Sequence, residues 1–373
     1  MRERTKNKTQ VEKIKVGITH GDINGVGYEV ILKCFMDEEM LDLCIPVVYG
    51  SPKVATYHKK TLNNQTNFLV RNSVTDVQER CLNLINCFGE EELKVEFGTP
   101  SEDSGRAAFM ALNQAVNDLA EGKIDVLVTA PLTNNTIKGK ESIFPGHSAF
   151  LEKRVGEGNK SLAIFISQNL RVALATTNIP VSEVSKHITK EFLTEKLTSL
   201  NNTLKRDFYI DGPRIAVLAL NPKGSENKEE EEIIAPTIKE LFDNSGIRSF
   251  GPYPANDFFG SNTYTYFDAV LAMYHDQGIA PFNAISMGEG LIYTAGLPVV
   301  RTAPVHGTQY DIAGKGKADE ASLRQAIFTA IDVFRNRARF DKAHANPLKR
   351  QYYEKRDDSD KLKLDQATES DTL

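Results

Sequence analysis

Short apolar runs rich in β-branched residues alternate along the chain with longer segments of helical periodicity, which predicts alternating strands and helices. The predicted strands are Lys15–Thr19, Ile45–Tyr49, Val126–Thr129, Ala163–Ser167, Val172–Thr176, Ile215–Leu220 and Ala269–Met273. The predicted helices are Gly105–Glu121, Val181–Leu204, Glu229–Asn244 and Ala321–Arg339. This order favours an α/β architecture with largely parallel sheets, in which ligands bind at the carboxyl ends of strands.

Length and charge narrow the classes of protein that this chain can belong to. Its 373 residues exceed the ~100–200 residues of one ordinary domain, so we expect two domains or one large α/β unit. The net charge of −5, from 45 basic and 50 acidic residues, argues against nucleic acid or an anionic membrane as partner. The four cysteines form no CxxC pair and the first residues are polar, so we expect a cytoplasmic protein with reduced thiols.

A glycine-rich segment, Gly17 to Gly27, follows the first predicted strand and precedes a helix expected to begin near Tyr28 or Glu29. Such a turn exposes backbone amides at a helix N-terminus, where an anion is favoured. A merely tight strand-to-helix turn explains the glycines equally well, and both readings stay open. We expect His20 to be a hydrogen-bonded residue of this turn, and His58 and His187 to lie at the surface of helices.

Three further segments carry more polar and glycine residues than a packed core needs. His147 and Ser148 stand at a predicted helix start, where they suit an N-cap or a substrate contact. His275, Asp276 and Gln277 follow an apolar strand directly, as metal ligands or orienting groups would. The loop from Arg301 to Ala318 combines glycines, lysines, His306 and Asp311, which suits nucleotide or phosphate binding.

Taken in order, these segments resemble the 4-hydroxythreonine-4-phosphate dehydrogenase family of vitamin B6 synthesis, which has the two-domain isocitrate/isopropylmalate dehydrogenase-like fold. The resemblance runs from about Lys15 to Arg339. The motifs that carry it are Gly21-Asp22-Ile23-Asn24-Gly25-Val26-Gly27, Val128-Thr129-Ala130-Pro131, Pro145-Gly146-His147, Leu174-Ala175-Thr176-Thr177, Leu220-Asn221-Pro222, Gly251 to Asn256, Met273 to Gly278 and Gly296 to Gly316.

The resemblance implies an NAD- or NADP-dependent oxidation of a small phosphorylated 3-hydroxy acid, followed by decarboxylation. It also implies a homodimer and a divalent metal ion (zinc, magnesium or cobalt) held by three histidines. The implied substrate contacts fall on His147, Ser148, Asn283 and Arg301. The implied cofactor contacts fall on His306, Gly307, Asp311, Ile312, Gly314 and Lys315.

Several positions depart from the family pattern, and they cluster where the chemistry belongs. Two of the three metal-ligand positions carry Asn178 and Lys223, and His275 alone is retained. Other polar positions of the family carry Asn134, Asn283, Ile292 and Val305. An ammonium ~4 Å from a divalent cation is repelled by about 8 kcal/mol at an effective dielectric constant of ~20, so Lys223 and a bound metal exclude one another.

Two functional hypotheses follow from these departures. In the first, the chain is a metal-independent dehydrogenase in which Lys223 is the electrophile, with His275 and Asp276 as the other catalytic residues. In the second, it is a catalytically degenerate paralogue with a binding or regulatory role. Phosphate acyltransferases resemble the same fold, but the loop from His306 to Ala318 and the Pro145-Gly146-His147 motif favour the dehydrogenase branch.

The domain organisation expected from the resemblance is discontinuous. The first α/β domain would comprise residues 1–138 and 297–340 and would contain the cofactor loop 306–318. The second α/β domain would comprise residues 139–296. Residues 341–373 are dense in charges of both signs and are expected to form a solvated C-terminal tail.

Overall fold

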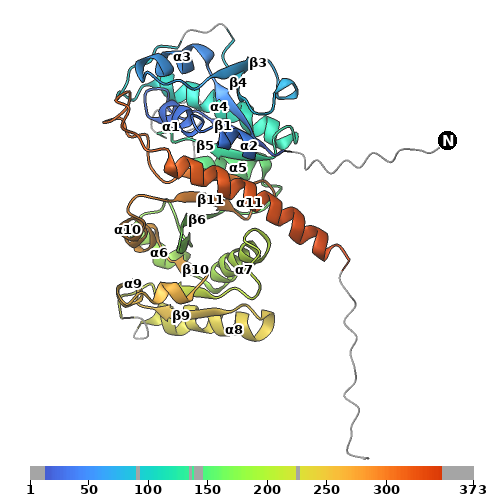
Figure 1. Ribbon diagram of the computed structural model, residues 1–373. Helices are drawn as coiled ribbons and strands as arrows, with labels where there is room; N and C mark the ends of the chain where they lie inside the picture. The colour runs from blue at the N-terminus through green and yellow to red at the C-terminus, as the bar shows by residue number, and fades with distance from the viewer. Residues whose placement is uncertain (1–12, 90–92, 134–136, 138–145, 224–226, 347–373) are drawn as a thin grey trace, which may run out of the picture.

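The structure, a computed structural model, describes residues 13–89, 93–133, 137, 146–223 and 227–346 (Figure 1). Asn134, Pro145 and most of the expected tail lie outside these residues. Twelve strands form one continuous sheet in the order β3-β4-β2-β1-β5-β12-β11-β6-β7-β10-β8-β9. In Figure 1 the strands of the amino-terminal part lie at the top and those of the central segment at the bottom, with helix α11 (Ala321–His344) crossing between them.

The twelve strands divide into a first half that shares one direction and a second half of mixed direction. The first six in sheet order run parallel to one another: β3 (Phe68–Arg71), β4 (Leu82–Asn86), β2 (Ile45–Gly50), β1 (Lys15–Thr19), β5 (Val126–Thr129) and β12 (Arg301–Pro304). The last six are β11 (Leu291–Ala295), β6 (Leu162–Ser167), β7 (Leu170–Leu174), β10 (Ala269–Ala272), β8 (Ile215–Leu218) and β9 (Ser249–Tyr253). The pairings β12–β11, β11–β6 and β6–β7 are antiparallel, and the other eight are parallel.

The α/β class with a mainly parallel sheet is therefore confirmed, and all seven predicted strands are present to within two residues at each end. The antiparallel centre reverses strand direction between the two outer groups. The carboxyl ends of the two outer groups consequently point to opposite edges of the sheet. A wholly parallel sheet would place all of them at one edge. The predicted domain boundary falls between β11 and β12, which are hydrogen-bonded neighbours, and the two-domain division stays a prediction.

The helices of the amino-terminal part are α1 (Gly27–Cys34), α2 (Glu39–Leu43), α3 (Pro52–Thr61), α4 (Glu102–Ala120) and α5 (His147–Val155), with a 3₁₀ turn at Val74–Asp76. The later ones are α6 (Val181–His187), α7 (Lys190–Arg206), α8 (Ala235–Ser245), α9 (Ala255–Gly260), α10 (His275–Ser286) and α11, with a 3₁₀ turn at Thr263–Tyr266 and a π-helical segment at Glu229–Ile234. No helix among the described residues is long and apolar enough to cross a membrane. All four cysteines are free thiols.

Two of the predicted helices differ from the structure. The segment predicted as one helix from Val181 to Leu204 is broken at Ile188 and Thr189, because the Thr189 side chain accepts a hydrogen bond from the Phe192 amide and starts a new helix, α7. The segment from Glu229 begins as a π-helix. There Glu230 is buried and accepts a hydrogen bond from the backbone N–H of Asn221 at 2.8 Å, so it anchors the end of β8.

A buried salt bridge ties α11 to the middle of the sheet. The Arg337 guanidinium donates to Asp207 Oδ1 at 2.7 Å and to the Tyr293 hydroxyl at 2.9 Å, and that hydroxyl donates to Asp207 Oδ2 at 2.6 Å. All three side chains are buried. Helix α11 packs against β5, β12 and β11, so this cluster fastens the C-terminal helix across the boundary between the two strand groups.

The prediction that His58 lies at the surface is wrong. His58 is buried on the α3 stripe that also holds Val54 and Ala55, and its Nε2 donates to the Ile23 carbonyl at 2.8 Å. Polar residues flank His58 in the sequence, so the buried face of α3 is not recognisable from the pattern alone. His20 is buried as well and stacks on Tyr28 with ring centroids 5.0 Å apart, and neither of its ring nitrogens has a hydrogen-bond partner within the described chain. His187 is exposed, as expected.

Candidate functional site

Five of the predicted site residues line one cavity of about 480 Å³ over the antiparallel centre of the sheet. Its floor is the face of β6 and β11 that carries Phe165 and Ile292, which are directly opposite each other in the ladder. Its walls come from α5, α7, the segment after β7 and the first turn of α10. The five predicted residues are His147, Ser148, Asn178, His275 and Arg301.

Arg301 is a buried cation at the start of β12. Its Nε donates to Thr129 Oγ1 and its Nη1 to Thr294 Oγ1, both at 3.0 Å. No carboxylate among the described residues forms an ion pair with it. Burial lowers its pKa to about 9, so the guanidinium is still charged at neutral pH. A buried charge without a counter-ion is unfavourable, and an anionic ligand in the cavity would supply that counter-ion.

His147 and Ser148 lie at the N-terminus of α5, as predicted. The helix starts after Gly146, whose φ of 93° is a conformation that favours glycine. Burial, and then the charge on Arg301, hold the pKa of His147 well below its usual value, so the imidazole is neutral at pH 7. The first amides of a helix have no intrahelical acceptor and favour an anion. Arg301 and this helix start therefore form one corner of the cavity whose chemistry suits an anion.

Asn178 and His275 also line the cavity. His275 is the first residue of α10, and its Nδ1 lies 2.8 Å from Asp276 Oδ1. A carboxylate at this distance holds a proton on Nδ1 and leaves Nε2 as the proton acceptor. Asp276 itself is exposed and does not line the cavity. The prediction that it orients His275 is consistent with this contact.

The donor atoms do not fit the metal site that the resemblance implies. No three His, Cys, Asp or Glu side chains in the described part of the chain are grouped closely enough to hold a metal ion. His275 is the one imidazole of the expected set, and the Asn178 amide beside it is a weak ligand for a transition metal. Lys223 is exposed beyond the end of β8 and does not line the cavity.

Two other polar residues near α10 are placed differently from what the motif suggests. Asn283 is exposed on α10 and lies outside the cavity lining. Gln277 is a structural link, because its Nε2 donates to the Ala219 carbonyl at 2.6 Å and its Oε1 accepts from the Met273 amide at 2.7 Å. It joins the carboxyl ends of β8 and β10 and thereby fixes where α10 begins.

The loop from Val305 to Ala318 packs on the glycine-rich turn. The buried Asp22 carboxylate accepts hydrogen bonds from the Tyr310 hydroxyl at 2.7 Å and from Ser104 Oγ at 2.9 Å. Lys33 Nζ donates to Glu29 Oε1 and to the carbonyls of Gly316 and Ala318. These bonds hold the loop against α1 and the start of α4.

This packing favours the tight-turn reading of the glycine-rich segment. The amides of Asn24, Gly25 and Val26 already donate to Asp22 Oδ1, the Asp22 carbonyl and the Thr308 carbonyl. A Cβ on Gly27 would overlap the His20 carbonyl oxygen, and one on Gly25 would come within 2.7 Å of the Thr308 carbonyl oxygen. The glycines are therefore required for close backbone approach, and these three amides are not available to an anion.

None of the six predicted cofactor residues lines the 480 Å³ cavity. They lie together on the loop from Val305 to Ala318: His306, Gly307, Asp311, Ile312, Gly314 and Lys315. Gly314 has a positive φ of 72° and faces the Phe97 ring, and Lys315 Nζ donates to the Asp311 carbonyl at 2.7 Å. His306 Nδ1 is 3.0 Å from the Gly307 carbonyl oxygen, whereas its Nε2 is buried without a hydrogen-bond partner among the described residues. That unused atom fits a ligand on this loop.

The whole chain is similar to known proteins of one family. The model of the family described as "Pyridoxal phosphate biosynthetic protein PdxA" matches residues 42–330. A 4-hydroxythreonine-4-phosphate dehydrogenase from Bacteroides thetaiotaomicron is 56% identical over 361 residues, which cover 96% of this chain and 99% of the relative. The chain belongs to the PdxA family.

Solved structures of PdxA-family enzymes agree with this assignment. A 4-hydroxythreonine-4-phosphate dehydrogenase from Burkholderia phymatum is 31% identical with a TM-score of 0.70, and the match covers 86% of this chain and 98% of that one.

A sequence relative from Oceanobacillus iheyensis is named "Putative D-threonate 4-phosphate dehydrogenase". It is 33% identical, and the match covers 85% of this chain and 97% of the relative. Family membership makes an oxidoreductase the expected class and does not favour the degenerate paralogue.

Some residues of this PdxA-family site were missed by sequence reasoning. Lys196, on α7, and Glu152, on α5, line the cavity together with the five predicted residues. Both sit in polar helical stretches, where nothing in the sequence separates a cavity-facing charge from a solvated one. Tyr310 lies within the predicted loop, but its contact with Asp22 spans 288 positions and has no local signal.

Proposed function

We propose that this protein is an NAD- or NADP-dependent dehydrogenase that oxidises 4-hydroxythreonine-4-phosphate in pyridoxal phosphate biosynthesis. The observation that carries the proposal is the buried Arg301 guanidinium, which has no carboxylate partner within the described chain and lies in a cavity with His147, Ser148 and His275. The 56% identity to a relative of that name over nearly its whole length supports the choice of substrate.

Arg301 and the N-terminus of α5 would bind the anionic end of the substrate. The neutral His147 imidazole and the Ser148 hydroxyl add hydrogen-bonding groups without adding a charge. Asn178 and His275 would then face the substrate hydroxyl. His275 Nε2 would accept the hydroxyl proton, and Asp276 would stabilise the imidazolium that forms through its contact with Nδ1.

Oxidation breaks the C–H bond at the carbinol carbon and the O–H bond of the hydroxyl, and it forms a carbonyl. NAD or NADP, when bound, accepts the hydride. The resulting β-keto acid loses its carboxyl group as CO₂, and the electron pair of the broken C–C bond passes into an enolate that is then protonated. The loop from Val305 to Ala318 would hold the cofactor, with His306 Nε2 as one hydrogen-bonding atom.

An electrophile must stabilise the negative charge that develops on the substrate oxygen. We derive no step through a metal ion, because the donor atoms do not fit one. Lys223 stays our proposed replacement for the metal charge, although it lies outside the lining of this cavity. If this is right, turnover persists in excess chelator and Lys223→Met lowers kcat. Activity that chelator abolishes and zinc or magnesium restores would exclude it.

Turnover of 4-hydroxythreonine-4-phosphate with NAD, and separately with NADP, tests the proposed function directly. We expect reduced cofactor and CO₂ to form in equal amounts. Arg301→Met and His275→Gln should each lower kcat/KM by at least about 100-fold, and the exposed His187→Gln serves as a matched control that keeps full activity. A folded wild-type protein that binds this substrate without oxidising it would instead support the paralogue hypothesis.

Two further parts of the proposal concern the setting of the enzyme. We propose that it works in the cytoplasm, consistent with its four free thiols, and that it forms a homodimer, as the family resemblance implies. Light scattering of the purified protein measures the assembly. A molar mass of one chain at the concentration of the activity assay, together with full activity, would refute the dimer.

A further inference from the structure

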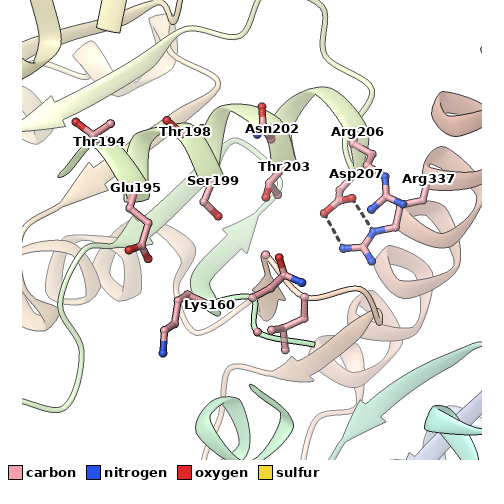
Figure 2. A pocket seen from close by; sticks show the side chains of 14 residues that line it. Lys160, Thr194, Glu195, Thr198, Ser199, Asn202, Thr203, Arg206, Asp207 and Arg337 are labelled. Carbon is pink, nitrogen blue, oxygen red and sulfur yellow. Dashed lines mark hydrogen bonds and ion pairs between the residues drawn. The ribbon is translucent and has the colours of Figure 1, made fainter. Parts of the chain in front are cut away.

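Lys196 is the one α7 residue that lines the substrate cavity. The neighbouring polar residues of α7, among them Thr194, Glu195 and Ser199, instead line a second cavity of about 530 Å³, as Figure 2 shows. The Lys196 side chain is only 12% exposed and passes over the Phe192 ring, with Nζ 5.3 Å from its centroid. A lysine packed in this way has lost much of the rotamer freedom that a solvated lysine keeps.

Within the described part of the chain, the charge on Lys196 is poorly compensated. Its nearest ion-pair partner is the neighbouring Glu195, with a closest N–O distance of 3.7 Å, too long for a hydrogen bond. The described lining of the cavity contains one carboxylate, Glu152, which already accepts from Lys160 Nζ and from the amide and hydroxyl of Ser161, all at 3.0 Å. Lys160, which lies outside the cavity lining, is thus the cation that pairs with Glu152.

Two cations, Lys196 and Arg301, therefore face the cavity without a committed counter-ion among the residues that the structure describes. A phosphate monoester carries about −1.5 to −2 charges at neutral pH, which matches two cations better than a carboxylate does.

We propose that Lys196 binds the phosphate group of the substrate together with Arg301. This inference rests on the proposed function, since it identifies which group of the substrate α7 recognises. Lysine acts on phosphate as a mobile point charge, whereas the planar Arg301 fixes direction. Lys196 is then a specificity-determining residue that selects phosphorylated over unphosphorylated hydroxy acids.

Calorimetric titration of inorganic phosphate into wild type and Lys196→Met tests the assignment. Because a hydrogen bond to a charged group contributes strongly to the free energy of binding, we expect inorganic phosphate to bind Lys196→Met about 10- to 100-fold more weakly than wild type. Lys196→Arg should recover most of the affinity. Lys190→Met is the matched control, because Lys190 lies on the same helix but is exposed and paired with Glu240, and its phosphate affinity should equal that of wild type. Thermal unfolding of each variant establishes that it is folded.

Steady-state kinetics separate this inference from the proposed function. Lys196→Met should raise KM for 4-hydroxythreonine-4-phosphate far more than it lowers kcat, and it should leave the KM for unphosphorylated 4-hydroxythreonine unchanged. An active wild type whose phosphate affinity is unaffected by Lys196→Met overturns this inference alone. Equal losses on the two substrates also overturn it, because Lys196 would then read the carboxylate. An inactive wild type overturns the proposed function.

Discussion

We expect mild acid to destabilise this protein through two buried histidines, His20 within the glycine-rich turn and His58 packed against it. Burial lowers the pKa of His20 to about 3 and that of His58 to about 4, against an ordinary value of 6.5. The unfolded chain therefore takes up these protons below about pH 6.5, whereas the folded chain does not. Stability is unaffected by these groups above that pH and falls as the pH drops below it.

The size of this destabilisation follows from the difference between the pKa of each histidine in the folded chain and in the unfolded chain. At about pH 5 each histidine is mostly protonated in the unfolded chain and neutral in the folded one, which lowers the free energy of unfolding by about 2 kcal/mol per residue. His20→Phe keeps the stacking on Tyr28 and removes the titrating group. We expect the difference in stability between about pH 8 and about pH 5 to shrink by about 2 kcal/mol in this variant.

Urea unfolding at the two pH values measures this difference. Comparing each variant with itself at the two pH values removes the contribution of any change in packing, which is present at both. The exposed His187→Gln should show the wild-type pH dependence. A His20→Phe variant with the same pH dependence as wild type would show that His20 is not held neutral, and the reasoning from burial would fail.

Three other substitutions test contacts described above. Asp207→Ala leaves Arg337 buried and unpaired, so we expect urea unfolding to show a loss of about 3–5 kcal/mol, and a loss below about 1 kcal/mol would contradict the buried pair. Lys33→Met removes the two hydrogen bonds from Lys33 to the loop from Val305 to Ala318, so we expect faster amide hydrogen exchange in that loop and a higher KM for NAD(P). Unchanged exchange would show that Lys33 does not hold the loop. In Gly27→Ala the added methyl group would overlap the His20 carbonyl oxygen, so we expect urea unfolding to show a less stable protein. A variant as stable as wild type would mean that the turn can open.

The sequence predicted those parts of the fold whose signal is local. The β-branched runs mark strands such as β1 and β5, and amphipathic periodicity marks α4 and α11. Strands β11 and β12 were not predicted, because they lie among the glycine, proline and polar residues of segments that resemble loops. The antiparallel centre that they create depends on which strands meet across the chain, which no local pattern specifies.

The site shows the same limit. His147 and His275 could be selected because each stands at a helix start beside motif residues, and the structure brings both to one cavity. Lys196 could not be selected from the sequence, because it reaches the cavity only through the way in which α7 packs against the sheet. Lys223 was selected by a local change of charge, yet the side chain lies outside the cavity lining, since residue type alone carries no direction in space.

The position of β12 has a consequence for biosynthesis. This strand is close to the C-terminus, yet it lies between β5 and β11 in the middle of the sheet. While the ribosome is still making the chain, β5 therefore has an open edge, and its neighbour arrives only after residue 300 has left the exit tunnel. Open strand edges invite pairing with other chains. Nascent chains that stall before β12 should accordingly bind chaperones or aggregate, and the stable sheet forms only near the end of translation.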